Sequence, residues 1–195
     1  MKVNFVKTFI PVKDFVAVEK VGNKMLVRFD AVKDADMDAY SCVEGSVSAS
    51  EYNEQEVRRE YEAWKQKWAE KALVLAKKAK IAEIAAYDTS SSVNGFTLNG
   101  LLVWLEKATR VGLMNSTTIA KAAGQKTTTL WLGGIKLVVD CDKAIQLLSA
   151  LEMYALECFN VTASHKQAVS ELTTIEEVEA YNYKSGYPKM LEMSV

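Results

Sequence analysis

The chain has 195 residues, of which 49% are hydrophobic and 25% are charged. These values are ordinary for a globular protein, so a hydrophobic core is expected and an intrinsically disordered chain is not. The formal net charge is -1, and neither half of the chain has the basic excess that nucleic-acid phosphates require, so no nucleic-acid partner is expected.

The first 45 residues have the pattern of β-structure. Two β-rich runs, 16–21 and 24–29, are joined by Gly22 and Asn23, which reach positive φ easily and therefore favour a hairpin. Apolar and polar residues alternate along the second run, so one of its faces is expected to be buried. A further short strand is predicted at 40–43. The acidic residues before it indicate a solvent-exposed turn: Asp34, Asp36 and Asp38.

A long helix is predicted next, from Asn53 to Ala86. Asn53 can cap its N-terminus, and Glu56 stands three residues later, which is the spacing of a capping box. No glycine or proline occurs from Glu51 to Asn94, and alanine, lysine and glutamate prevail, all of which favour helix. Acidic residues gather at its beginning and lysines towards its end, an order that complements the helix dipole.

One stripe of this helix has heptad spacing with one inserted step, as in a coiled coil with a stutter. Its members are Val57, Tyr61, Trp64, Trp68, Ala72, Leu75, Ala79, Ala82 and Ala86. The stripe predicts a partner helix and hence a homo-oligomer. The predicted interface residues are Val57, Tyr61, Trp64, Trp68 and Leu75. The alternative is a helix that lies along its own domain.

A linker at 88–92 separates this helix from the second half of the chain. After it, the runs 96–98 and 101–105 flank Asn99 and Gly100, a pair typical of type I′ hairpin turns. The sequence therefore predicts a first β-hairpin directly after the linker.

A helix is predicted from Lys107 to Ala123, followed by a second hairpin. This hairpin pairs 127–132 with 135–139 through Gly133 and Gly134. The second half of the chain thus begins with two hairpins separated by a helix.

A second long helix is predicted at about 142–171. Its seam alternates steps of four and three: Ala144, Leu148, Leu151, Ala155, Cys158, Thr162, His165, Val169 and Leu172. Other apolar residues widen the stripe, which suits packing on a sheet or bundle better than a narrow two-stranded coil. Thr173 with Glu176 predicts a last short helix, and a tyrosine-rich tail follows.

The predicted fold class is α+β. The expected divisions are a β-rich docking region at 1–50 that contains the N-terminal hairpin, a long coiled-coil-like helix at 51–87, and a C-terminal domain at 88–195 made of two β-hairpins with helices.

His165 is the chain's one histidine, so a Ser-His-Asp or Cys-His mechanism would have to use it. It lies on the apolar stripe of the second long helix, and Cys158 is two turns away, ~10 Å along the axis. That distance is too long for a nucleophile–base pair or a shared metal ion, so a structural histidine is predicted. The cysteines are odd in number and form no C-x-x-C pair, which indicates reduced, buried thiols: Cys42, Cys141 and Cys158.

Asp140 and Asp142 flank a predicted helix start, where capping explains them, and a Ca²⁺ or Mg²⁺ site is the weaker alternative. The chain has no glycine-rich phosphate-binding motif, no H-E-x-x-H and no G-x-S-x-G. No catalytic, cofactor-binding or metal-binding residue is predicted, so the chain is not expected to be an enzyme.

The start of the chain has no recognisable signal peptide. No uncharged apolar stretch approaches the ~18 residues that span a bilayer. A soluble protein made inside the cell is therefore expected, without a membrane partner.

Four tryptophans remain to be placed. Trp64 and Trp68 stand one turn apart on the first long helix, and an interface is favoured for them because tryptophan is enriched at interface centres. Trp104 and Trp131 lie in the hairpin strands, where core packing is predicted.

Several short motifs lie in the second half: Val93 to Gly100, Val103 to Lys107, Arg110 to Leu113, Thr129 to Trp131, Leu151 to Ala155, and Tyr187-Pro188. On these motifs, residues 84–188 resemble an uncharacterised domain family of tailed bacteriophages and of prophages in gut Bacteroidales. Its members are often encoded near tail-fibre proteins or fused to them. The N-terminal hairpin leading to Tyr40-Ser41-Cys42 is similar to the leading part of small phage proteins.

The resemblance implies a phage virion protein, associated with the tail or tail fibre and made in the bacterial cytoplasm. Its partners would be other phage virion proteins and further copies of itself. One alternative is a tail-fibre assembly chaperone that leaves the particle. Another is a carbohydrate-binding module or an enzyme that uses Trp104, Trp131 and the tyrosine-rich tail.

Overall fold

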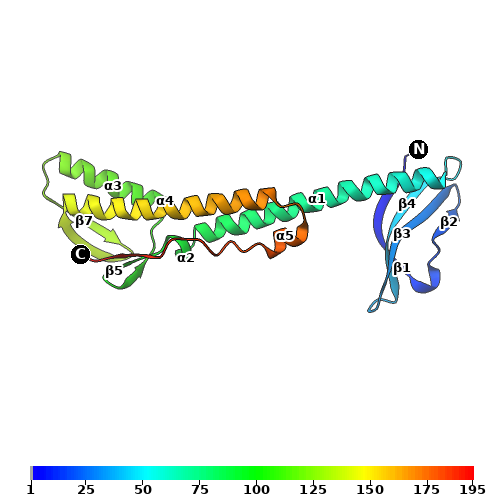
Figure 1. The fold of residues 1–195 in the computed structure, drawn as a ribbon, viewed down its shortest axis with the longest axis horizontal. Helices are drawn as coiled ribbons and strands as arrows, with labels where there is room; N and C mark the ends of the chain where they lie inside the picture. Colours follow the sequence, from blue (N-terminus) through cyan, green and yellow to red (C-terminus); the bar gives the residue numbers. More distant parts are fainter. Residues whose placement is uncertain (1) are drawn as a thin grey trace. The chain divides into compact units, whose positions relative to one another are not determined.

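A computed structural model describes residues 2–195, and the fold is α+β (Figure 1). Contacts divide the chain into two compact units, Met1–Ala72 and Leu73–Val195. The boundary falls inside helix α1 (Glu54–Asp88). The three expected segments do not coincide with these units, because the long helix contributes its first half to one unit and its second half to the other.

The first unit contains a four-stranded antiparallel sheet of order β1-β4-β3-β2. Its strands are β1 (Asn4–Pro11), β2 (Val18–Val21), β3 (Lys24–Asp34) and β4 (Ala39–Ser48), with the 3-10 turn η1 (Val12–Asp14) after β1. The predicted hairpin is confirmed as β2–β3, and Gly22 has a φ of +59° in its turn. Strand β4 is longer than the short strand predicted at 40–43.

One face of this sheet packs against the first turns of α1. The buried side chains of that core are Val27, Phe29, Val43, Val47, Val57 and Tyr61. A β-bulge after Phe29 puts Asp30 at a φ of +48°. The Asp30 carboxylate accepts hydrogen bonds from the Tyr61 hydroxyl at 2.8 Å and from the Lys65 ammonium at 2.7 Å. The bulge therefore ties the sheet to the helix at a polar contact beside the core.

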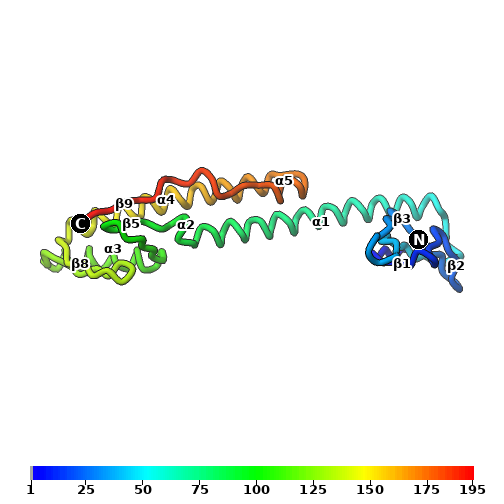
Figure 2. Tube along the Cα trace, turned by 90° about the horizontal axis from the view of Figure 1, so that it is seen from below, coloured from blue at the N-terminus to red at the C-terminus, as the bar shows by residue number. Residues whose placement is uncertain are grey.

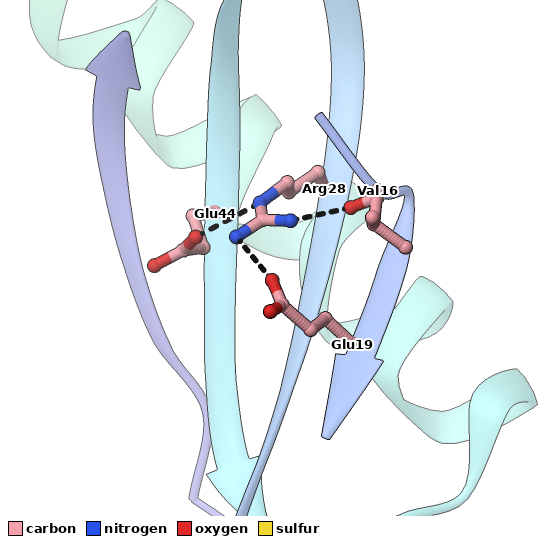
Figure 3. Close-up of polar contacts among 4 residues, drawn as sticks. All are labelled: Val16, Glu19, Arg28 and Glu44. Atoms are coloured by element: carbon pink, nitrogen blue, oxygen red, sulfur yellow. Dashed lines mark hydrogen bonds and ion pairs between the residues drawn. The ribbon is translucent and has the colours of Figure 1, made fainter. Parts of the chain in front are cut away.

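The opposite face of the sheet holds a buried arginine, Arg28 (Figure 3). Its Nε donates to Glu44 at 3.0 Å and its Nη1 donates to the carbonyl oxygen of Val16 at 2.5 Å. Its Nη2 pairs with Glu19 at 3.0 Å. All three nitrogens are thus engaged by neighbouring segments of the same unit, which satisfies the buried guanidinium.

The second unit is arranged around helix α4 (Cys141–Glu171). The same unit contains a three-stranded sheet of order β6-β5-β9 and the hairpin β7–β8. The remaining elements are α2 (Ser91–Asn94), β5 (Phe96–Leu98), β6 (Leu101–Val103), α3 (Lys107–Ala122), β7 (Thr127–Leu132), β8 (Ile135–Asp140), α5 (Ile175–Ala180) and β9 (Leu191–Met193). Both predicted hairpins are confirmed, with Asn99-Gly100 and Gly133-Gly134 at positive φ in their turns.

The predicted seam of α4 is confirmed. Seven of its nine members are buried: Ala144, Leu148, Leu151, Ala155, Cys158, Thr162 and Val169. Its N-terminal part packs on the two hairpins, and its C-terminal part runs antiparallel beside the second half of α1 (Figures 1 and 2). Lys77 donates to the carbonyl oxygen of Ser170 at 2.7 Å, and Thr162 donates to Asp88 at 2.7 Å, which fixes this pairing.

The second half of α1 packs through a different face from the predicted stripe. Ile84 is fully buried with Val169 and Val178, and Leu73 and Ile81 pack on the same cluster. The predicted stripe members Leu75, Ala79, Ala82 and Ala86 are exposed instead. The physical reason is that α1 carries two apolar faces, and the one with isoleucines buries more apolar area against α4 than the alanine-rich one.

Helix termini follow the predicted capping chemistry closely. The Asn53 side chain accepts from the Glu56 N–H at 3.1 Å, as predicted. The capping box of α5 uses Thr174 and Glu177, one residue later than the predicted Thr173 and Glu176. Hydrogen bonds from the backbone N–H groups of Thr173 and Thr174 hold the pKa of Glu177 below its ordinary value.

Candidate functional site

His165 has a structural position. Its Nε2 lies 2.9 Å from the carbonyl oxygen of Ser185, which can only accept, so Nε2 carries a proton. Its Nδ1 lies 2.8 Å from the Tyr181 hydroxyl. Both ring nitrogens therefore tie α4 to the tail, as the sequence predicts for a structural histidine.

The polar residues considered for other chemistry also have local partners. Asp140 caps α4 by accepting from the Asp142 N–H at 2.8 Å, and Asp142 pairs with Lys121. Asp34 accepts from two backbone N–H groups of its own turn. Within residues 2–195, no group of three or more His, Cys, Asp or Glu side chains is placed to hold a metal ion.

All three cysteines are buried and free, as predicted. Burial raises the pKa of the Cys42 and Cys158 thiols above the ordinary value. A raised pKa leaves the thiol protonated, and the thiolate is the nucleophilic form, so these two cysteines are unsuited to nucleophilic chemistry.

The five predicted interface residues are distributed between core and surface. Val57 and Tyr61 belong to the core of the first unit, so the prediction that a partner helix covers them needs correction. Strands β3 and β4 cover them because those strands turn their apolar face to α1. Trp64 is half-buried, with its ring 5.6 Å from that of Phe5.

Trp68 and Leu75 remain at the surface, with exposed fractions of 46% and 57%. The ring of Trp68 stacks on that of Trp64 at 5.4 Å between centroids, and the Lys7 ammonium lies 5.1 Å from the Trp68 ring. The stacked rings of Trp64 and Trp68 thus extend from the core of the first unit to an exposed indole.

The other two tryptophans depart from the predicted core packing. Trp131 lies on the outward face of β7 and is 58% exposed, so that prediction is wrong for Trp131. It stands opposite Lys136, whereas the neighbouring Leu130 and Leu132 face the core. Trp104 follows β6 and lines a cavity that includes neither Trp131 nor a tail tyrosine. The structure therefore does not bring the proposed sugar-binding aromatics together in that cavity.

This cavity, of about 500 Å³, is a candidate site of the second unit. Its walls are the turn after α1, the segment leading into α3, the first turn of α3, and one side of α4. The lining residues are Asp88, Thr89, Asn94, Trp104, Leu105, Glu106, Lys107, Arg110, Glu152, Ala155, Leu156 and Phe159. Mostly apolar walls with a few convergent polar groups are typical of small-molecule sites.

Arg110 is the buried charge of the cavity, with a side chain only 8% exposed. Its Nε donates to Glu152 at 2.8 Å, and its Nη1 donates to the carbonyl oxygen of Leu105 at 2.8 Å. The ion pair joins α3 to α4 at the cavity wall. The buried indole N–H of Trp104 has no acceptor among residues 2–195.

The sequence analysis did not select Arg110 and Glu152 as site residues. Both stand in motifs that carried the family resemblance, Arg110 to Leu113 and Leu151 to Ala155. A further signal was available, because an arginine in the first turn of a helix opposes the helix dipole and calls for a compensating carboxylate.

The chain belongs to the family described as "Domain of unknown function (DUF4376)", whose model matches residues 75–183. The match includes every residue that lines the cavity. It covers most of the region, 84–188, in which the sequence resembles an uncharacterised domain family. Comparison with curated proteins and with solved structures gives no match. Within residues 2–195, no helix has both the length and the apolar composition that a membrane crossing needs.

Proposed function

We propose that this member of the DUF4376 family is a bacteriophage virion protein, associated with the tail or tail fibre, that acts through self-association and contacts with other virion proteins. It is made in the bacterial cytoplasm and assembles there into the particle. The resemblance of residues 84–188 supports the phage setting, and the DUF4376 match supports the family.

The observation that carries the self-association part is the exposed apolar surface of α1. Trp68 is exposed in the first half of the helix, and Val74 and Leu75 are exposed in the second half. Trp68 and Leu75 are seven residues apart and therefore share one helix face. Exposed large apolar side chains that gather on one element mark interaction surfaces.

The test is the mass of the purified chain by light scattering over a range of concentrations. The wild type is expected to form a defined oligomer, and the double variant Trp68→Ala/Leu75→Ala is expected to be a monomer. The matched control is Ile119→Ala/Val138→Ala, which removes two other exposed apolar side chains and should leave the oligomer intact. A wild-type monomer at every concentration contradicts self-association through α1.

The choice of Trp68 and Leu75 follows from the packing of Trp64. Trp64 contacts Phe5 and Tyr61, so its replacement would also weaken the first unit. Leaving Trp64 in place separates loss of an interface from loss of folding.

A second experiment separates a virion part from an assembly factor. Mass spectrometry of purified particles from a phage that encodes the chain is expected to detect it in stoichiometric amount. Its absence from particles, together with a stable complex with an incomplete fibre, would instead support the tail-fibre assembly chaperone.

A further inference from the structure

Strand β1 is a free edge of the sheet in the first unit. It pairs with β4 along its whole length, and its other side pairs with no strand among residues 2–195. It has eight residues and carries exposed apolar side chains on both faces, Val6 at 54% and Phe9 at 58%. The opposite edge strand, β2, has only four residues, and short edge strands are one way in which proteins avoid edge pairing. The edge available to a further strand is therefore β1.

The ladder between β1 and β4 fixes which backbone groups of β1 point outwards. In an antiparallel strand, the N–H and C=O groups of alternate residues point to one neighbour and then to the other. The Val12 N–H donates to the Asp38 carbonyl oxygen at 3.0 Å in the same register, so the even-numbered residues of β1 are the ones bonded to β4. The backbone groups of Phe5, Lys7 and Phe9 therefore face away from β4.

Helix α1 crosses the sheet from β3 towards this edge. The Tyr61 ring stacks on that of Phe29 in β3, with centroids 4.1 Å apart. Two turns later, the ammonium of Lys7 in β1 lies 5.1 Å from the exposed ring of Trp68. A lysine on an edge strand opposes pairing, but the Lys7 ammonium is turned towards α1 and away from the edge itself. An exposed indole thus lies beside the free edge.

A second copy of the chain complements this edge. Phe9 lies on the same face of β1 as Lys7, because alternate residues of a strand share a face, and α1 of its own chain leaves it exposed. A two-fold axis through Thr8, perpendicular to the sheet, would set Lys7 opposite Phe9 of the second copy. Trp68, beside Lys7, would then cover that Phe9, and the symmetry would repeat the contact. A register centred on Lys7 would instead place two lysines opposite each other, which is unfavourable.

We propose that β1 pairs with β1 of a second copy, antiparallel and centred on Thr8, so that one sheet continues through two chains and Trp68 of each chain covers Phe9 of the other. Lys7 of each chain exchanges backbone hydrogen bonds with Phe9 of the other. Such an interface is isologous, as in most homodimers, and uses the strand addition by which sheet edges bind extended chains. It rests on the self-association proposed above and adds a second element to that interface.

The first test is the oligomer dissociation constant of Lys7→Pro, measured by light scattering over a range of concentrations. Proline removes an outward N–H and leaves the bonds to β4 intact, so the constant is expected to rise about tenfold or more. Lys7→Ala removes the same side chain and keeps the N–H, so its effect should be smaller. The matched control is Lys20→Pro, also at an outward position because Arg28 and Ala17 form a hydrogen-bonded pair of the β2–β3 ladder. Equal effects of Lys7→Pro and either of the other two variants would overturn the proposal.

Cysteine cross-linking tests the register without a proline. Thr8 would lie directly opposite Thr8 of the second copy in a non-hydrogen-bonded pair, with Cα atoms about 4.5 Å apart, which a disulfide can bridge. Thr8→Cys is made together with Cys42→Ala, because Cys42 stands opposite Thr8 in β4, and mild oxidation is expected to give a covalent dimer. Val6→Cys in the same background is the control, since the two copies of residue 6 would lie about 13 Å apart. Absence of the Thr8→Cys dimer, or equal cross-linking of both variants, would overturn this pairing.

The outcomes separate this proposal from self-association through α1. A wild type that stays a monomer at every concentration contradicts both. An oligomer that Trp68→Ala/Leu75→Ala dissociates and Lys7→Pro leaves intact keeps self-association through α1 and overturns the pairing of β1. Dissociation by Lys7→Pro, with Lys20→Pro still oligomeric and Thr8→Cys cross-linked, supports the continuous sheet.

Discussion

The replacement Tyr61→Ala tests whether the first half of α1 packs on its own sheet or on another copy of the chain. Tyr61 is almost fully buried, and its ring stacks on Phe29 with centroids 4.1 Å apart. Removal of a buried aromatic side chain costs about 3–5 kcal/mol of unfolding free energy. Tyr61→Phe removes only the hydrogen bond to Asp30, which keeps its bond from Lys65, so about 0.5–1 kcal/mol is expected.

The assay is urea unfolding followed by tryptophan fluorescence at two protein concentrations tenfold apart. Trp64 and Trp68 lie beside the replaced side chain and report on this unit. The control is Trp68→Ala, whose half-exposed ring should cost less than about 1 kcal/mol of folding free energy. If the loss from Tyr61→Ala disappears at the higher concentration, Tyr61 packs against another copy, and its assignment to an intramolecular core is wrong.

Three further predictions follow from local contacts. The hydrogen bond from Lys65 lowers the pKa of Asp30, so the ionised carboxylate stabilises the fold above its unfolded-state pKa of 3.8, and this stabilisation is lost as pH falls below that value. The thermal midpoint of the wild type should therefore fall in this acidic range, and the midpoint of Asp30→Asn should depend less on pH there. Burial raises the pKa of Tyr154 to about 12, so the fold loses stability as pH rises from 10 to 12, and Tyr154→Phe should show a smaller loss in alkaline urea titrations. Gly133→Ala would put a Cβ 2.9 Å from Val103 Cγ1 at a φ of +57°, so urea unfolding should show a loss of about 1–3 kcal/mol.

Local chemistry explains which elements of the second unit could be predicted. The turns at Asn99-Gly100 and Gly133-Gly134 need positive φ, which these residues adopt at little cost, so both hairpins were predictable from two residues each. The α4 seam was predictable because one wide apolar stripe leaves a helix a single way to bury it.

The packing of α1 was not predictable in the same way, because this helix has two apolar faces. One contains Ile81 and Ile84 and meets α4, and the other contains Trp68 and Leu75 and stays exposed. Periodicity shows that each face is apolar, but it gives no information about which element of the fold packs against that face. Strand β9 was not predicted for a related reason. It consists of only three residues, which are too few to show a periodicity, and it pairs with β5 from a much earlier part of the chain.

The candidate site could not be predicted from the sequence, because it depends on which groups the folded chain brings to each side chain. Arg28 and Arg110 are both arginines beside apolar residues, and both fold into buried positions with a glutamate partner. Arg28 becomes a closed structural contact because β2 and the segment before it bring Glu19 and the Val16 carbonyl to its remaining nitrogens. No segment brings a third acceptor to Arg110 among residues 2–195, and the helix start next to it also lacks acceptors. The difference lies in which neighbours the fold brings to each guanidinium, and those neighbours meet only once the chain is folded.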